Sequence, residues 1–239
     1  MKKIIYFNLM NDAQQSASRK DRLLLFIGDS ITRRSRDLPD YPIGRGFVAI
    51  IAERLCSLVP EISIINRGIG GNTSSDLVSR WDNDCIRHAP AAVSILIGIN
   101  DTIRRYCEGR ETPLEQFERN YRDIIERTVK KLKAVLILCE PFLLPLSTDQ
   151  KKWRDDLIPK QECIRRLAQE YGARFVPFQQ VFMENAAMSH FRALTEDGVH
   201  PTLQGYTCMA DAWMQRNFGN NIPAKEAVKA ISGTEMKME

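Results

Sequence analysis

Several features that would narrow the function of this chain at once are missing from its sequence. The six cysteines lie far apart and none forms a C-x-x-C pair, which argues against a zinc site. No stretch approaches the ~20 apolar residues that a membrane-spanning helix needs. The formal net charge is only +4, which does not indicate a nucleic-acid partner. We therefore expect no metal, no membrane span and no nucleic acid.

Histidine is also scarce, with only His88, His190 and His200 in the chain. A mechanism that uses an imidazole as general base therefore has three candidates. We interpret His88 and His190 as ordinary surface or loop residues. This leaves His200, which follows Asp197 by three residues and is itself followed by Pro201.

The chain has 239 residues, and 44% of them are hydrophobic, which is enough for one well-buried core. Residues 1–21 are predicted to be a flexible leader, residues 22–218 the folded domain and residues 219–239 a polar tail. The first ten residues resemble a short signal peptide whose apolar stretch is interrupted by Asn8. Because scattered single cysteines are usually reduced, we expect a cytoplasmic protein, with secretion as the less favoured alternative.

Apolar strands alternate with amphipathic helices from Leu23 onward. Strands are predicted at 23–27, 62–65, 93–97, 134–139 and 174–176. Helices are predicted at 46–58, 74–86, 113 to about 133, 153–171 and 202–217. Short strands separated by helices favour parallel pairing. The predicted fold class is therefore α/β, a three-layer α/β/α sandwich with a five-stranded parallel sheet of the flavodoxin-like kind.

Polar residues and glycines follow three of the predicted strands at their carboxyl ends. Ser30 follows the first strand, Gly71 and Asn72 follow the second, and Asn100 follows the third. Ligands of open parallel sheets bind beyond the carboxyl ends of the strands. We therefore expect these four residues to lie along one edge of the sheet, where they would form a site.

Ser30, Asp197 and His200 supply the residue types that acyl transfer needs. A serine hydroxyl is a poor nucleophile at neutral pH until an imidazole takes its proton and a carboxylate holds that imidazole in one tautomer. Ser30 is predicted as the nucleophile, His200 as the base and Asp197 as the partner of His200. The glycine-rich turn at 66–73 and the amide of Asn100 offer donors for an oxyanion, each worth ~3 kcal/mol of transition-state stabilisation in comparable sites.

Four short motifs stand in one order along the chain: Gly28-Asp29-Ser30, the turn at Gly71, Gly98-x-Asn100-Asp101 and Asp197-x-x-His200. Each motif is weak alone, but in this order they resemble the four sequence blocks of SGNH hydrolases, also called GDSL esterases. The resemblance covers roughly residues 22–218. It implies that Ser30 is both nucleophile and oxyanion donor through its own N–H, and that Gly71 N–H and the Asn100 amide are the other donors. It also implies that His200 is the base, with Asp197 as its partner.

Further residues resemble the SGNH acetylxylan esterases, which remove acetyl groups from xylan and xylo-oligosaccharides. They are Asn72-Thr73 with Asp76-Leu77, Arg80-Trp81, the run 97–101 followed by Arg104 and Tyr106, and Glu140-Pro141-Phe142. Two positions depart from that group. Arg33-Arg34 stand where it usually has an acidic residue, and Glu196 stands where relatives often carry an aromatic or small residue. Both positions could border the substrate, so the resemblance bears on the chemistry more than on the sugar.

The candidate substrate contacts are Asp29, Asn72, Arg80, Trp81 and Arg104. We favour Asp29 as a residue that shapes the turn after the first strand. Arg80 and Trp81 are favoured as a helix-packing face over a sugar contact, because tryptophan is mostly buried. Asp101 is interpreted as structural. Arg33, Arg34 and Arg36 are interpreted as a solvated helix face, with attraction of an anionic substituent, such as a glucuronate or a phosphate, as the alternative.

We therefore expect a serine esterase that removes short acyl groups, above all acetyl, from carbohydrate through an acyl-enzyme on Ser30 and without a cofactor. Its partner would be a small-molecule or oligosaccharide ester, and a homo-oligomer is left open. The alternatives are a lysophospholipase or thioesterase of the same fold and a non-catalytic carbohydrate-binding protein. A nucleotide binder is disfavoured, because Ser30-Ile31-Thr32-Arg33 replaces a glycine-rich loop after the first strand.

Overall fold

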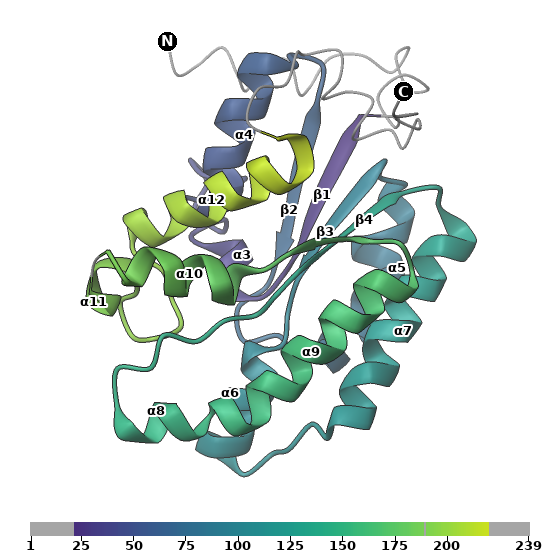
Figure 1. Ribbon diagram of the computed structural model, residues 1–239. Helices are drawn as coiled ribbons and strands as arrows, with labels where there is room; N and C mark the ends of the chain where they lie inside the picture. Colours follow the sequence, from purple (N-terminus) through teal and green to yellow (C-terminus); the bar gives the residue numbers. More distant parts are fainter. Residues whose placement is uncertain (1–21, 189, 220–239) are drawn as a thin grey trace, which may run out of the picture.

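The computed structural model describes residues 22–188 and 190–219, in which five strands form one parallel sheet in the order β2-β1-β3-β4-β5 (Figure 1). The strands are β1 Leu23–Gly28, β2 Ser63–Gly68, β3 Ala92–Leu96, β4 Val135–Cys139 and β5 Arg174–Val176. All five were predicted to within a few residues, and the predicted three-layer α/β/α sandwich is confirmed. The predicted leader and the predicted tail, apart from Gly219, lie outside the described residues.

Two groups of long helices cover the two faces of the sheet (Figure 1). One face carries α4 Phe47–Leu58, α10 Phe178–Ala186 and α12 Leu203–Phe218. The other face carries α5 Ser74–Asp84, α7 Leu114–Lys131 and α9 Arg154–Glu170. The remaining helices are α3 Ser30–Arg33, α6 Ile99–Glu108, α8 Thr148–Lys152 and α11 Phe191–Leu194, with the 3-10 turn η1 Ile86–His88 before β3.

The alternation of side chains along the strands divides the core into two layers. In β1, Leu24 and Phe26 pack with α4 and α12, whereas Leu25 and Ile27 pack with α5 and α7. A strand that is buried on both faces is an almost continuous apolar run, as is usual in parallel sheets. This explains why the apolar runs of the sequence predicted the strands well.

The helix α6, which carries Asn100, was not predicted. Its sequence INDTIRRYCE buries only Ile99, Asp101 and Thr102, two of which are polar. Ile99, Ile103 and Tyr106 do stand at helical spacing, but this stripe spans only ten residues directly after a strand, and over so short a stretch periodicity does not separate a helix from a turn. Asn100 consequently lies in the first turn of a helix, where the sequence suggested a turn after the third strand. No helix in the described part of the chain is long and apolar enough to cross a membrane.

Candidate active site

Ser30 is the first residue of α3, directly after the tight turn that ends β1. Asp29 caps α3, because its Oδ1 accepts a hydrogen bond from the N–H of Ile31 at 2.9 Å. A Cβ on Gly28 would lie 2.2 Å from the carbonyl oxygen of Leu96, and a Cβ on Gly68 would lie 2.3 Å from the backbone nitrogen of Arg33. These two glycines therefore allow α3 to pack against the ends of the neighbouring strands, which places Ser30 at the carboxyl edge of the sheet.

His200 lies within hydrogen-bonding distance of Ser30, although 170 residues separate the two in the sequence. Ser30 Oγ is 2.9 Å from His200 Nε2, and His200 Nδ1 is 2.7 Å from Asp197 Oδ2. A carboxylate at Nδ1 favours the tautomer that carries its proton there, so that Nε2 is free to accept the proton of the serine. The structure thus brings together the three residues predicted to be catalytic, in the order nucleophile, base and orienting carboxylate.

Asp197 also shapes the turn that carries His200. Its Oδ1 accepts hydrogen bonds from the backbone N–H of Val199 at 2.9 Å and of His200 at 2.7 Å. Gly198, between them, has a φ of +97°, which favours glycine. Burial raises the pKa of Asp197, but the hydrogen bonds from His200 and Val199 outweigh it and hold the pKa below the ordinary 3.8. Asp197 is therefore ionised at neutral pH, as the acceptor for an imidazole N–H needs to be.

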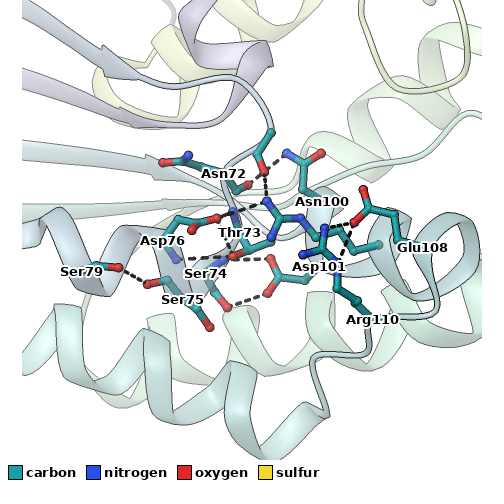
Figure 2. A network of polar contacts seen from close by, with 12 residues as sticks. Asn72, Thr73, Ser74, Ser75, Asp76, Ser79, Asn100, Asp101, Glu108 and Arg110 are labelled. Atoms are coloured by element: carbon teal, nitrogen blue, oxygen red, sulfur yellow. Dashed lines mark hydrogen bonds and ion pairs between the residues drawn. The ribbon is translucent and has the colours of Figure 1, made fainter.

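Gly71 and Asn100, the other predicted oxyanion donors, belong to two segments that meet at Asn72. The amide of Asn100 donates to the carbonyl oxygen of Asn72 at 3.0 Å, and Figure 2 shows these two side by side. Gly71 has a φ of +76°, and its carbonyl oxygen accepts a hydrogen bond from Arg104 at 2.8 Å. The loop after β2 and the start of α6 are therefore held in one place at the edge where Ser30 lies.

A model of the GDSL-like lipase/acylhydrolase family matches residues 26–208 of the chain. The chain belongs to this family. It is therefore a carboxylic ester hydrolase with the fold of the SGNH hydrolases, as the four motifs suggested. The acetylxylan esterase of Geobacillus stearothermophilus is 34% identical over 203 residues, which are 80% of this chain and 92% of that protein.

Solved structures extend the comparison. The crystal structure of the Geobacillus acetylxylan esterase matches this chain with a TM-score of 0.74 and 33% identity, over 82% of this chain and 93% of that one. A GDSL-like lipase candidate from Parabacteroides merdae matches with a TM-score of 0.78 and 35% identity, over 82% and 95%. The thioesterase 1/protease 1/lysophospholipase L1 of Escherichia coli is 25% identical over 81% of both chains.

Buried hydrogen bonds hold the start of α6 in this esterase (Figure 2). Asp101 is fully buried and accepts from the backbone N–H of Ser74 at 2.9 Å and from its hydroxyl at 2.7 Å. Asn120 donates to the same hydroxyl at 2.9 Å. Burial raises the pKa of Asp101, while the bonds from Ser74 lower it. Asp101 thus has the structural role that the sequence suggested, because it ties α6 to α5 beside Asn100.

Arg80 supports the same loop from the side of β1 and β2. Its Nε donates to Asn72 Oδ1 at 2.7 Å, and its Nη1 and Nη2 donate to the carbonyl oxygens of Arg67 at 2.9 Å and Gly28 at 3.0 Å. The side chain is only 14% exposed and also forms an ion pair with Asp84 at 2.8 Å. Arg80 therefore links the loop after β2 to the ends of β1 and β2. Its guanidinium donors already have partners within the protein.

Two of the five candidate substrate contacts were wrong. Asp29 and Trp81 have no exposed surface, so no substrate can reach them in this structure. Trp81 packs between α5 and α7 and donates from Nε1 to Thr128 Oγ1 at 3.0 Å. The preferred interpretations, a turn-shaping Asp29 and a packed Trp81, agree with the structure. Asn72 and Arg104 lie on the loop after β2 and on α6, and their contact with substrate stays a prediction.

The structure adds contacts around the predicted base that the sequence did not predict. Gln150 of α8 donates to the carbonyl oxygen of Asp197 at 2.7 Å and receives the N–H of Leu146 on its own Oε1 at 2.7 Å. Glu196, directly before Asp197, accepts from Arg34 at 2.8 Å. No local motif signals the contacts of Gln150 with Asp197 and of Arg34 with Glu196, because each joins segments far apart in the sequence. Within residues 22–188 and 190–219, no group of three or more His, Cys, Asp or Glu is placed to hold a metal ion.

Proposed function

We propose that this esterase removes acetyl groups from short acetylated carbohydrates such as xylo-oligosaccharides. The observation that carries the proposal is the chain of hydrogen bonds from Ser30 through His200 to Asp197 at the carboxyl edge of the sheet. The acetyl group and the sugar are supported by the similarity to the Geobacillus acetylxylan esterase. Crystal structures of three catalytic mutants of that esterase have a serine, an aspartate or a histidine changed to alanine. These are the residue types of Ser30, Asp197 and His200.

In the proposed mechanism, Ser30 Oγ attacks the carbonyl carbon of the ester while its proton passes to His200 Nε2. The oxyanion receives hydrogen bonds from the N–H groups of Ser30 and Gly71 and from the amide of Asn100. When the intermediate collapses, the bond from the carbonyl carbon to the sugar oxygen breaks, and that oxygen takes the proton from His200. Water then attacks the acetylated Ser30 with His200 again as the base, so that acetate leaves and the serine hydroxyl is restored.

The first test is hydrolysis of an ester series from acetyl to decanoyl, with Ser30→Ala as the control, followed by acetate release from acetylated xylo-oligosaccharides. We expect a sharp preference for acetyl and release of acetate from the sugar. A rate that rises with the length of the acyl chain would favour the lysophospholipase or thioesterase alternative. The similarity to the thioesterase 1/protease 1/lysophospholipase L1 of Escherichia coli supports that alternative. No Ser30-dependent rate on any ester would leave the binding-protein alternative.

The role of His200 as base is tested by pH. The imidazole must be neutral to accept the proton of Ser30, so activity is expected to fall as the pH is lowered. The measurement is kcat/KM between pH 5 and 8 on a non-ionising acetate ester. A flat profile over this range would count against His200 as the general base.

The cytoplasm stays our proposal for where the protein acts. All six cysteines are free in the structure. Free thiols are usual in the reducing cytoplasm, which supports this location. Fractionation of the source cells with an antibody against this chain tests it, and recovery from the culture medium would overturn it.

A further inference from the structure

Two arginines follow Ser30 within one turn of the chain, at the end of α3. The backbone N–H of Arg33 binds the carbonyl oxygen of Asp29 at 2.9 Å, and that of Arg34 binds Ser30 at 3.0 Å, so the segment is one helical turn. Residues three and four positions apart on a helix are neighbours on its surface. Arg33 and Arg34 therefore stand about one turn after the predicted nucleophile, as the last residue and the C-cap of α3.

The guanidinium of Arg33 lies against the loop that carries Gly71. A Cβ built on Gly70 would be 3.3 Å from Arg33 Cζ and 3.4 Å from its Nη1. Gly70 does not have a positive φ, so the glycine is useful here mainly for the room that it leaves. The Nε of Arg33 is buried and finds no hydrogen-bond partner in the described part of the chain, while its Nη1 pairs with Asp37 at 3.0 Å.

The guanidinium of Arg34 lies on the other side, against the loop that carries the catalytic histidine. Its Nη2 is 2.8 Å from Glu196 Oε1, and its Cζ lies 5.7 Å from the centre of the Tyr206 ring. Glu196 directly precedes Asp197 in the sequence. The two guanidinium groups thus flank Ser30, with Arg33 beside the loop of the predicted oxyanion donor and Arg34 beside the loop of the base.

Both arginines are accessible, and their present partners are weak ones. The side chains of Arg33 and Arg34 are 40% and 37% exposed, and those of Asp37 and Glu196 are 56% and 48% exposed. Ion pairs of such exposure contribute little to stability, so an anion brought in by the substrate can compete for the arginines. A planar guanidinium binds a carboxylate or a phosphate with two parallel hydrogen bonds, which suits it to select such a group.

We propose that Arg33 and Arg34 form a subsite for an anionic substituent, a carboxylate or a phosphate, on the acylated sugar. The inference rests on the proposed function, because the anion is placed by the same sugar whose ester meets Ser30. An acetylated oligosaccharide that carries a uronate near the acetyl group is the substrate class with this chemistry. An acetylated sugar phosphate is the other source of such an anion.

The test compares kcat/KM on three acetylated substrates: a neutral xylo-oligosaccharide, the same oligosaccharide with a glucuronate branch, and an acetylated oligosaccharide of the same length that carries a phosphate. The readout is the ratio of kcat/KM on each anionic substrate to that on the neutral one. We expect a ratio above one at low salt that falls as sodium chloride is added, because exposed charges are screened. Whichever anion gives the larger ratio identifies the source.

Variants then separate a subsite from a structural brace. Arg33→Gln and Arg34→Gln should each lower the ratio about two- to fivefold, the size that exposed charge pairs give. Glu196→Gln should raise it, because it removes the carboxylate that competes for Arg34. Arg54→Gln is the matched control, since Arg54 is an exposed arginine of α4 that pairs with Asp211 of α12, and it should leave the ratio unchanged.

A brace between the two loops would behave differently. Breaking the Arg34–Glu196 pair from either end would then change the rates on neutral and anionic substrates alike. Arg34→Gln and Glu196→Gln would therefore leave the ratio of kcat/KM unchanged, or would change it in the same direction. That result would overturn the subsite. Equal rates on neutral and anionic substrates, with Ser30-dependent turnover intact, would also overturn it while leaving the esterase proposal standing. Absence of Ser30-dependent turnover on every ester would overturn both.

Discussion

Replacement of Asp29 by asparagine tests how the turn before Ser30 is built. Asp29 is fully buried, its Oδ1 accepts the N–H of Ile31, and its Oδ2 finds no hydrogen-bond partner among residues 22–188 and 190–219. Burial raises the pKa of this carboxyl from 3.8 to about 7, although the hydrogen bond from Ile31 and the nearby His200 lower it. Asparagine keeps an oxygen that can cap α3 and removes the group that titrates.

The sign of the effect follows from where the proton is held. The folded protein keeps the Asp29 proton at pH values where the unfolded chain has already lost it, so unfolding releases a proton. The free energy of unfolding therefore falls as the pH rises above about 4, and the fall is complete once the pH exceeds about 7. At about 1.4 kcal/mol per pH unit, the full range corresponds to about 4 kcal/mol, an upper value because the site can relax around the charge.

The assay is urea denaturation of the wild type and Asp29→Asn at several pH values between 4.5 and 8.5. We expect the variant to gain stability relative to the wild type as the pH rises, by up to about 4 kcal/mol, with no further gain above pH 8. Titration of other groups is common to both proteins and cancels in the difference. Parallel stability profiles of the two proteins would refute the reasoning, since they would mean that Asp29 titrates as it does in the unfolded chain.

Three further substitutions test the site. Asn100→Ala should lower kcat on an aryl acetate about 10²- to 10³-fold by removing an oxyanion donor, and an unchanged kcat would exclude Asn100 from that role. Arg80→Lys keeps the charge but loses the planar fork that reaches Gly28, Arg67 and Asn72, so urea denaturation should show a loss of about 2–4 kcal/mol; a loss below the error of the method would mean that the fork is dispensable. Trp81→Phe should lower the free energy of unfolding by about 1 kcal/mol through the lost hydrogen bond to Thr128 and leave KM unchanged. A raised KM would instead support a contact between Trp81 and the sugar.

The fold could be predicted because its central strands carry their own signal. Strands β1 and β3 are apolar on both faces, so their positions follow from runs of apolar residues, and the helices between them show an apolar stripe. The helix α6 carries only a short apolar stripe and lies at the carboxyl edge of the sheet, where Asp101 accepts hydrogen bonds from Ser74 and Thr102 donates one to Asp156. Those bonds depend on which elements meet in space, and sequence periodicity holds no information about them.

The site, like the fold, has residues that the sequence predicts and contacts that only the structure shows. Ser30, His200 and Asp197 could be predicted because acyl transfer demands these residue types, and because histidine is rare in the chain. The contacts that hold them could not, since Gln150 meets Asp197 across 47 residues and Arg34 meets Glu196 across 162. Such contacts depend on the paths of the loops after β4 and β5. Arg80 was favoured as a packing residue, but its two hydrogen bonds to the ends of β1 and β2 and its bond to Asn72 appear only in the structure.

The sheet order explains why the two halves of the site are held so differently. Strands β2, β1 and β3 are direct neighbours, so the residues that follow them, Gly71, Ser30 and Asn100, come together through the register of the sheet. His200 follows no strand of the sheet and reaches Ser30 from a loop between α11 and α12. The distance from Ser30 to His200 therefore depends on side-chain contacts such as those of Gln150, and substitutions around this loop should change the chemical step while the sheet and the oxyanion loop stay intact.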